Sequence, residues 1–169
     1  MWSSPALALA LAACTAAAAC SDPAAPEDCT LGGFADGETT VHEAPLGPFV
    51  RAAQTTLPAS ALGTTHALVF AEAAGTCGEP AATGRSLALL FCEPPTERTY
   101  IAVARSQFRC PGDNVLAIVE DAGGVDVTTG TAGTIRIEQA GTCALGTYGV
   151  TFGGDVIEGA FDAAVCDAP

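Results

Sequence analysis

Short runs of alternating apolar and polar residues, separated by glycine, proline and aspartate, constrain this chain more than any other feature. Near the C-terminus, Tyr148, Val150 and Phe152 alternate with small or polar neighbours, and Ile157 to Ala163 repeats the pattern after the turn residues 153–155. Side chains that alternate with period two lie on opposite faces of a β-strand. We therefore expect a C-terminal β-meander.

Similar strand signals recur from residue 29 onward, with turn residues about every 8 to 12 positions. We expect Asp36-Gly37 to turn a short hairpin, 98–104 to return as the hairpin partner of 87–92, and one short helix at Pro58 to Leu62. The fold class expected is all-β, an antiparallel β-sandwich or barrel-like meander with little or no helix. The remaining expected strands are 31–35, 39–43, 67–71, 115–120, 125–129 and 133–138.

The first 28 residues differ from the rest and are typical of an export and anchoring segment. Pro5 to Ala19 is almost wholly Ala and Leu and carries no charge, which is short for a bilayer span but suits a signal peptide. Residues 1–4 supply no Lys or Arg. We expect a signal peptide at 1–19, a lipidated cysteine with a flexible tether at 20–28, and a single disulfide-bridged β domain at 29–169.

Two cysteines compete for the lipidation site. Leu11-Ala12-Ala13-Cys14 and Ala17-Ala18-Ala19-Cys20 both resemble the bacterial lipobox, in which small residues precede an acylated cysteine. Cys20 is favoured because it leaves a longer apolar segment and an even number of later cysteines; Cys14 is the alternative. The expected location is the cell envelope, as an outer-membrane lipoprotein held by a lipid anchor, and simple secretion is the alternative.

The later cysteines predict disulfide bonds rather than a metal site. No Cys-x-x-Cys pair occurs among them, whereas zinc sites need such clustered ligands. Six cysteines allow fifteen pairings, and we favour Cys92 with Cys110, because a hairpin between them would bring both ends together. The other four would then pair as Cys77 with Cys166 and Cys29 with Cys143.

The charge balance excludes some partners. The chain carries 19 Asp and Glu against six basic residues, all Arg, for a formal net charge of −13. Such a chain repels phosphate backbones and offers no basic patch that would release counterions. We therefore expect no nucleic-acid partner and no affinity for anionic lipid surfaces.

Catalytic motifs are absent from the sequence, and we expect no catalytic residues, no metal and no cofactor. There is no nucleophile elbow, zinc-protease motif, phosphate-binding loop or dinucleotide fingerprint. The two histidines, His42 and His66, are expected to be surface or structural residues. Asp113-Asn114, Glu120-Asp121 and Asp126 could place oxygen ligands for Ca²⁺ around two turns, although such residues are also common turn formers.

Three stretches together resemble a group of uncharacterised bacterial lipoproteins. They are the Ala-rich signal ending in a lipobox-like cysteine, Ala67 to Phe70 leading into Cys77, and the closing segment that contains Gly159-Ala160-Phe161-Asp162-Ala163-Ala164-Val165-Cys166. The resemblance implies a small β-rich domain ending in Gly-x-Phe-Asp-Ala-x-x-Cys. It implies no functional residues, and Cys92, Cys110 and Cys143 are additional to the shared pattern.

These observations predict a membrane-tethered cell-envelope lipoprotein domain with a binding or structural role. Its partner would be an envelope protein or a glycan. A secreted hydrolase with an unrecognised site is one alternative, which requires His42 or His66 beside a carboxylate and a hydroxyl. A protein-binding, inhibitor-like module is the other, which requires a rigid exposed loop such as Glu93 to Arg98.

Overall fold

The computed structural model describes residues 34–58, 62–73, 83–121 and 127–166. Within those ranges the chain forms twelve β-strands and no helix, so the all-β prediction is confirmed. The strands are β1 Phe34–Ala35, β2 Thr39–Val41, β3 Ala44–Leu46, β4 Arg51–Thr56, β5 His66–Ala71, β6 Ser86–Phe91, β7 Thr99–Val103, β8 Asn114–Glu120, β9 Val127–Thr129, β10 Ala132–Gln139, β11 Cys143–Phe152 and β12 Asp155–Val165.

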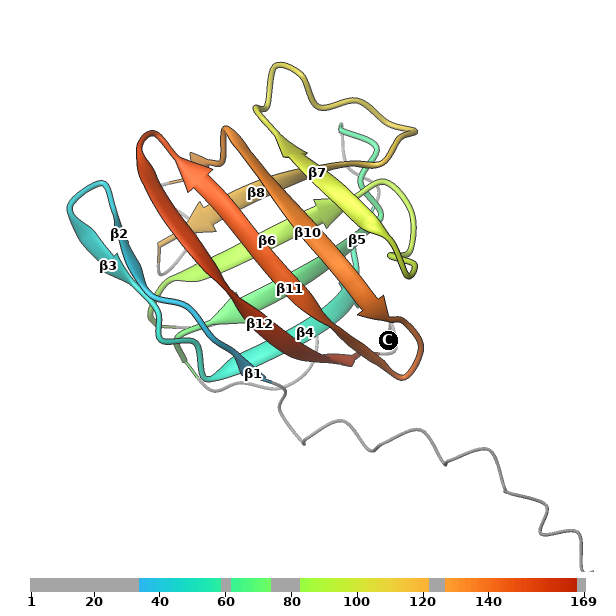
Figure 1. Ribbon diagram of the computed structural model, residues 1–169, viewed down its shortest axis with the longest axis horizontal. Helices are drawn as coiled ribbons and strands as arrows, with labels where there is room; N and C mark the ends of the chain where they lie inside the picture. The colour runs from blue at the N-terminus through green and yellow to red at the C-terminus, as the bar shows by residue number, and fades with distance from the viewer. Residues whose placement is uncertain (1–33, 59–61, 74–82, 122–126, 167–169) are drawn as a thin grey trace, which may run out of the picture.

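Eight of these strands close into a barrel built from two antiparallel groups of four. One group is β4, β5, β6 and β8, and the other is β7, β10, β11 and β12. In Figure 1 the strands β10, β11 and β12 run across the front of the molecule, and the first group runs behind them in a different direction. The groups meet at two parallel seams, β7 with β8 and β12 with β4.

The inside of the barrel is a packed core. Phe70, Phe91 and Phe152 are fully buried there. The Phe70 ring lies 5.0 Å from the ring of Tyr148 and 5.3 Å from that of Phe161, measured between centroids. An eight-stranded barrel has an interior just wide enough for side chains to fill it. The large aromatic side chains therefore occupy the space that a ligand would take in a wider barrel.

The C-terminal meander has the predicted strands and turn. β10, β11 and β12 pair in sequence, with Ile135 opposite Tyr148 and Tyr148 opposite Gly159. Gly153 turns the last hairpin with a positive φ of 69°. The alternation seen in the sequence corresponds to the inward and outward faces of this sheet.

A second, smaller apolar cluster covers the outside of the barrel over β8. Val115, Ala117 and Val119 of β8 belong to the main core, whereas Leu116 and Ile118 pack with Phe108 and Cys92 in the second cluster. β8 is thus buried on both faces. This explains why its sequence is a continuous apolar run without alternation.

Two of the expected hairpins are wrong. β7 does not pair with β6; it pairs with β10 and, in parallel, with β8, while β6 pairs with β5 and β8. The segment 92–98 crosses from one group of strands to the other instead of turning back. The Asp36-Gly37 hairpin is also absent, because β1 pairs with β12 and the hairpin turn lies at His42-Glu43. The expected helix at 58–62 falls largely outside the described residues.

Backbone residues 35–37 fill the place where β12 and β4 diverge. β12 pairs with β4 only at Ala164 and Val165. On the same edge of β12, β1 pairs with Asp162 and Phe161. The Tyr148 hydroxyl donates a hydrogen bond to the Asp36 carbonyl. Burial, with a smaller contribution from the Asp36 carboxylate, raises the pKa of Tyr148, so this hydroxyl keeps its proton.

Candidate functional site

The two histidines lie at opposite ends of the barrel. His42 is exposed at the tip of the β2–β3 hairpin, where φ is 53°. That hairpin contacts Arg85, which precedes β6 at the end where Ser86 pairs with Ala71, the last residue of β5. His66 is the first residue of β5, so the length of that strand separates it from the hairpin. The structure does not bring the two histidines into one site.

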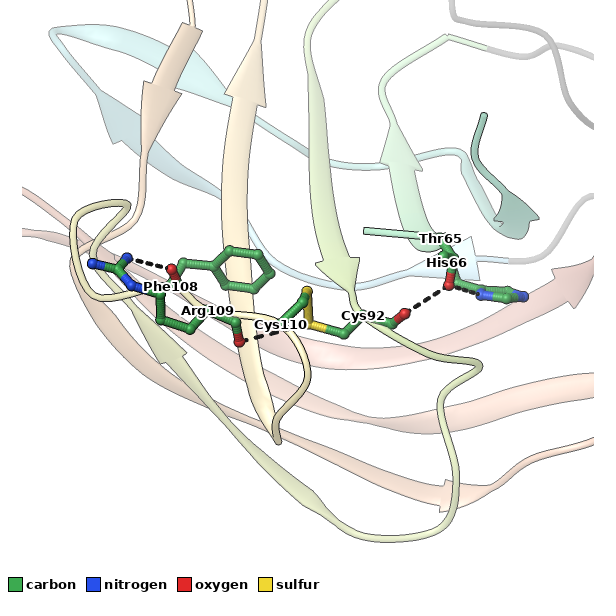
Figure 2. The surroundings of a disulfide bond; sticks show 6 residues. All are labelled: Thr65, His66, Cys92, Phe108, Arg109 and Cys110. Carbon is green, nitrogen blue, oxygen red and sulfur yellow. Dashed lines mark hydrogen bonds between the residues drawn. A yellow bond between two sulfur atoms is a disulfide. The ribbon is translucent and has the colours of Figure 1, made fainter. Parts of the chain in front are cut away.

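His66 takes part in a structural hydrogen-bond chain. The Thr65 hydroxyl donates to the carbonyl of Cys92 at 2.8 Å, so it accepts its second bond, also 2.8 Å, from His66 Nδ1 (Figure 2). This arrangement assigns the proton to Nδ1. Burial lowers the pKa of His66 and so favours the neutral ring. The Thr65 hydroxyl donates its proton to the Cys92 carbonyl, and no carboxylate among the described residues is bonded to the His66 ring. The histidine, carboxylate and hydroxyl expected of a hydrolase are therefore not brought together at His66.

The carboxylates considered for Ca²⁺ are separated by the length of β8. Asp113 precedes that strand and forms an ion pair with Arg98 at 2.6 Å. Asp121 follows it and pairs with Arg85 at 2.6 Å. Asp126 lies outside the described residues. In the part of the chain that the structure describes, no three His, Cys, Asp or Glu side chains gather as metal ligands.

The disulfide expected between Cys92 and Cys110 is present, with 5.5 Å between the Cα atoms. Cys143 and Cys166 are also disulfide-bonded. Their expected partners, Cys29 and Cys77, lie outside the described residues, as do both lipidation candidates, Cys14 and Cys20.

Arg85 holds the β2–β3 hairpin against the barrel, a role that sequence reasoning missed. Its Nη1 donates to the carbonyls of Ala44 and Pro45 at 2.8 and 2.9 Å, and its Nη2 donates to that of Val41 at 3.3 Å. Its Nε donates to the Asp121 carboxylate. The planar guanidinium thus joins the hairpin to Asp121, just after the C-terminal end of β8. Its fixed set of N–H donors can bond several acceptors at once.

Glu72 completes this junction from the other side of the hairpin. One carboxylate oxygen accepts from the backbone N–H of Gly47 at 2.8 Å, and the other accepts from the backbone N–H of Arg85 at 2.7 Å. The hairpin is therefore bound at both its ends. No sequence motif marks this set, because its members come from four separate segments.

Three neighbouring loops, residues 62–65, 92–98 and 104–113, are fastened to one another and are called the stapled loops below. The Cys92–Cys110 disulfide joins two of them, and the Thr65 hydroxyl bonds the first to the second. The Arg98–Asp113 ion pair makes a further link. Figure 2 shows the Phe108 ring directed to the strand beneath, where it is buried in the second apolar cluster. These links restrain the backbone of the stapled loops relative to one another.

An open, shallow depression of about 510 Å³ lies on the outer face of the meander. Thr134, Thr147 and Glu158 line it, and it forms where Gly149 has no side chain between its neighbours on β10 and β12. A Cβ at Gly149 would meet only the Glu158 Cβ, at an ordinary 3.8 Å. The depression is a gap in a flat strand face rather than an enclosed site.

Comparison with known proteins gives no relative. No family model, no curated protein and no solved structure matches this chain. Within the described ranges, no helix has the length and apolar character needed to cross a membrane.

Proposed function

We propose that this chain is an exported cell-envelope lipoprotein domain, held on a membrane by a lipid on Cys20, or on Cys14 as the alternative, that acts by binding a partner or by structural support. The observation that carries the anchor is the uncharged apolar run at 5–19 ending in lipobox-like cysteines and followed by a proline-rich acidic segment. Acylation at a single cysteine with more than one chain gives a stable membrane anchor.

The location of the folded part supports this role. The first described strand, β1, begins at Phe34, fourteen residues after Cys20. At about 3.3 to 3.6 Å per extended residue, such a segment reaches at most roughly 50 Å from the anchor. The domain would therefore stay within that distance of the membrane.

The packed barrel supports a role performed on the outer surface. Its interior is filled by side chains such as Phe70 and Phe91, which leaves the loops and outer strand faces for contacts with other molecules. Among the described residues, His42 and His66 also lie apart from each other, and neither forms an ion pair with a carboxylate. A binding or structural role needs neither histidine.

Metabolic labelling with an alkyne-bearing fatty acid tests the anchor. We expect the wild-type chain to be labelled and to fractionate with membranes, and the label to disappear in Cys20→Ala while Cys14→Ala and the matched control Ser21→Ala retain it. Loss of label in Cys14→Ala alone would move the anchor to that residue. An unlabelled wild-type chain, or a label that survives both cysteine substitutions, would contradict the lipoprotein proposal.

A further inference from the structure

The arginines of this acidic chain are unevenly placed. Of the six arginines, three lie in the stapled loops: Arg98, Arg105 and Arg109. The same loops hold three acidic residues, Glu93, Glu97 and Asp113, so this region is neutral on a chain with a formal net charge of −13. The stapled loops therefore repel an acidic partner less than the rest of the surface does.

Four of the six arginines are buried or paired with an acidic side chain. Arg51 is buried, Arg85 is bound to Asp121 and hairpin carbonyls, and Arg98 is bound to Asp113. Arg136 lies 3.4 Å from Glu138 on the exposed face of β10.

Arg105 and Arg109 differ because no carboxylate among the described residues pairs with either of them, and both are exposed. Arg109 gives one N–H to the neighbouring Phe108 carbonyl at 2.6 Å. Their remaining donors face solvent.

The loop that carries both residues is rigid. The backbone N–H groups of Gln107 and Phe108 both donate to the Ala104 carbonyl, at 2.8 and 3.1 Å, which closes a turn between the two arginines. Phe108 is buried and Cys110 is held by its disulfide. Figure 2 shows the Arg109 side chain extending away from that disulfide. The backbone of the loop therefore has little conformational entropy left to lose on binding, which favours tighter binding.

The loop also lies far from the end where the described chain begins. In Figure 1 the connection from β7 to β8 is at the top of the molecule, and β1 is at the bottom. If the chain is anchored through residues before Phe34, as proposed above, the 104–113 loop lies on the side of the domain opposite the anchored end. This loop is then accessible to another envelope component.

We propose that the stapled loops are a docking surface for a partner protein, which would present carboxylate side chains opposite Arg105 and Arg109. Guanidinium groups favour planar, two-oxygen acceptors such as carboxylates. The interspersed Glu93 and Glu97 favour a protein over a uniform polyanion, because a protein can match alternating charges in register. The inference rests on the proposed binding role and names the partner class for it.

Chemical-shift mapping by NMR tests this surface with a peptide of alternating glutamate and lysine, (Glu-Lys)4, as the probe. The exported chain, isotopically labelled and purified in neutral detergent, is titrated with the peptide. We expect chemical-shift changes of the amides in 92–98 and 104–113. The dissociation constant should be about fivefold larger for the double variant Arg105→Gln/Arg109→Gln, as the loss of two exposed ion pairs implies. The matched control Arg136→Gln should bind as the wild type does.

Parallel titrations with inorganic phosphate and with anionic phospholipid vesicles separate the sources of negative charge. Shifts with the alternating peptide, and none with phosphate or vesicles, support the proposal. Absence of shifts in the stapled loops, equal weakening in Arg136→Gln, equal shifts with phosphate, or tighter binding to vesicles would each overturn it. Because this titration does not depend on acylation, its failure leaves the labelling result intact, and a failed labelling experiment leaves the titration interpretable.

Discussion

At Gly159 the backbone of β12 meets the Asp36 carbonyl with no room for a methyl group between them. A Cβ built there overlaps that oxygen, which belongs to backbone and cannot turn aside. We expect Gly159→Ala to lower the free energy of unfolding by about 1 to 3 kcal/mol, the range for forcing extra volume into a packed site. Urea unfolding measures this. The matched control is Gly149→Ala on β11, where a Cβ meets an ordinary contact, and an equal loss in both would contradict the account.

His66 gives the stability of the protein a dependence on pH. Its pKa lies below the ordinary 6.5 because of burial, so the unfolded chain takes up a proton at a higher pH than the folded chain does. The free energy of unfolding should therefore fall as the pH drops below about 6.5, until the lowered folded pKa is reached.

The variant His66→Asn tests this dependence. Its amide can still donate to the Thr65 hydroxyl but does not titrate in this range. Chemical unfolding at about pH 7.5 and about pH 5.5 should show a smaller loss of stability in His66→Asn than in the wild type. An identical loss in both proteins would show that His66 does not contribute.

At the scale of the element, Arg85 fastens the β2–β3 hairpin, whose own two strands have three residues each. Replacing Arg85 by Met keeps the apolar stem but leaves the carbonyls of Val41, Ala44 and Pro45 without their charged donor. We expect a loss of roughly 2 kcal/mol, because hydrogen bonds to charged groups exceed neutral ones. Amide hydrogen exchange should accelerate in Thr39–Leu46 before the barrel strands. Arg136→Met is the matched control, and hairpin protection equal to that of the wild type in Arg85→Met would be inconsistent with this role.

Individual strands were easier to predict from sequence than their partners were. β10, β11 and β12 alternate strongly because one face of each is buried, and short turns join them. β4 was not predicted, because Arg51–Thr56 shows no alternation: its first three residues are all buried. The predicted pairing of β6 with β7 was wrong, because a run of apolar residues indicates that a strand is buried but not which strand lies beside it.

The candidate sites show the same limit. The Cys92–Cys110 disulfide was predicted through a hairpin that does not exist; the two cysteines instead meet where separate loops cover β8. Arg85 and Glu72 gave no signal, because their partners are mostly backbone groups brought together by topology. Contacts between distant segments depend on the closure of the barrel and cannot be derived from local pattern.

At the scale of the whole molecule, barrel closure and the Cys92–Cys110 disulfide stabilise the protein in different ways. Closure pairs every barrel strand with two neighbours, whereas the disulfide holds loops on the outside. Replacing both cysteines by Ala should lower the free energy of unfolding by about 3 kcal/mol, from the loop-closure entropy of an 18-residue separation. The far-UV circular dichroism spectrum should remain that of a β protein. Loss of that spectrum would mean that the bridge is needed for the barrel itself.

The excess of negative charge also acts on the molecule as a whole. With a formal net charge of −13, the folded chain holds like charges closer together than the unfolded chain does. Salt screens such repulsion, with a Debye length of about 30 Å at 0.01 M and about 10 Å at 0.1 M. We therefore expect the midpoint of thermal unfolding to rise as NaCl increases from about 0.01 M to about 0.3 M.

Choline chloride and CaCl₂ at matched ionic strength distinguish general screening from a specific ion site. Screening depends on ionic strength, so NaCl and choline chloride should raise the unfolding midpoint equally. Asp113 and Asp121, at the two ends of β8, are paired with Arg98 and Arg85 and lie apart, so these two carboxylates give Ca²⁺ no shared site. A midpoint that rises further in CaCl₂ than in the other two salts would require a calcium site elsewhere in the chain, whereas a midpoint that falls with salt would show that attraction between the paired charges outweighs the repulsion.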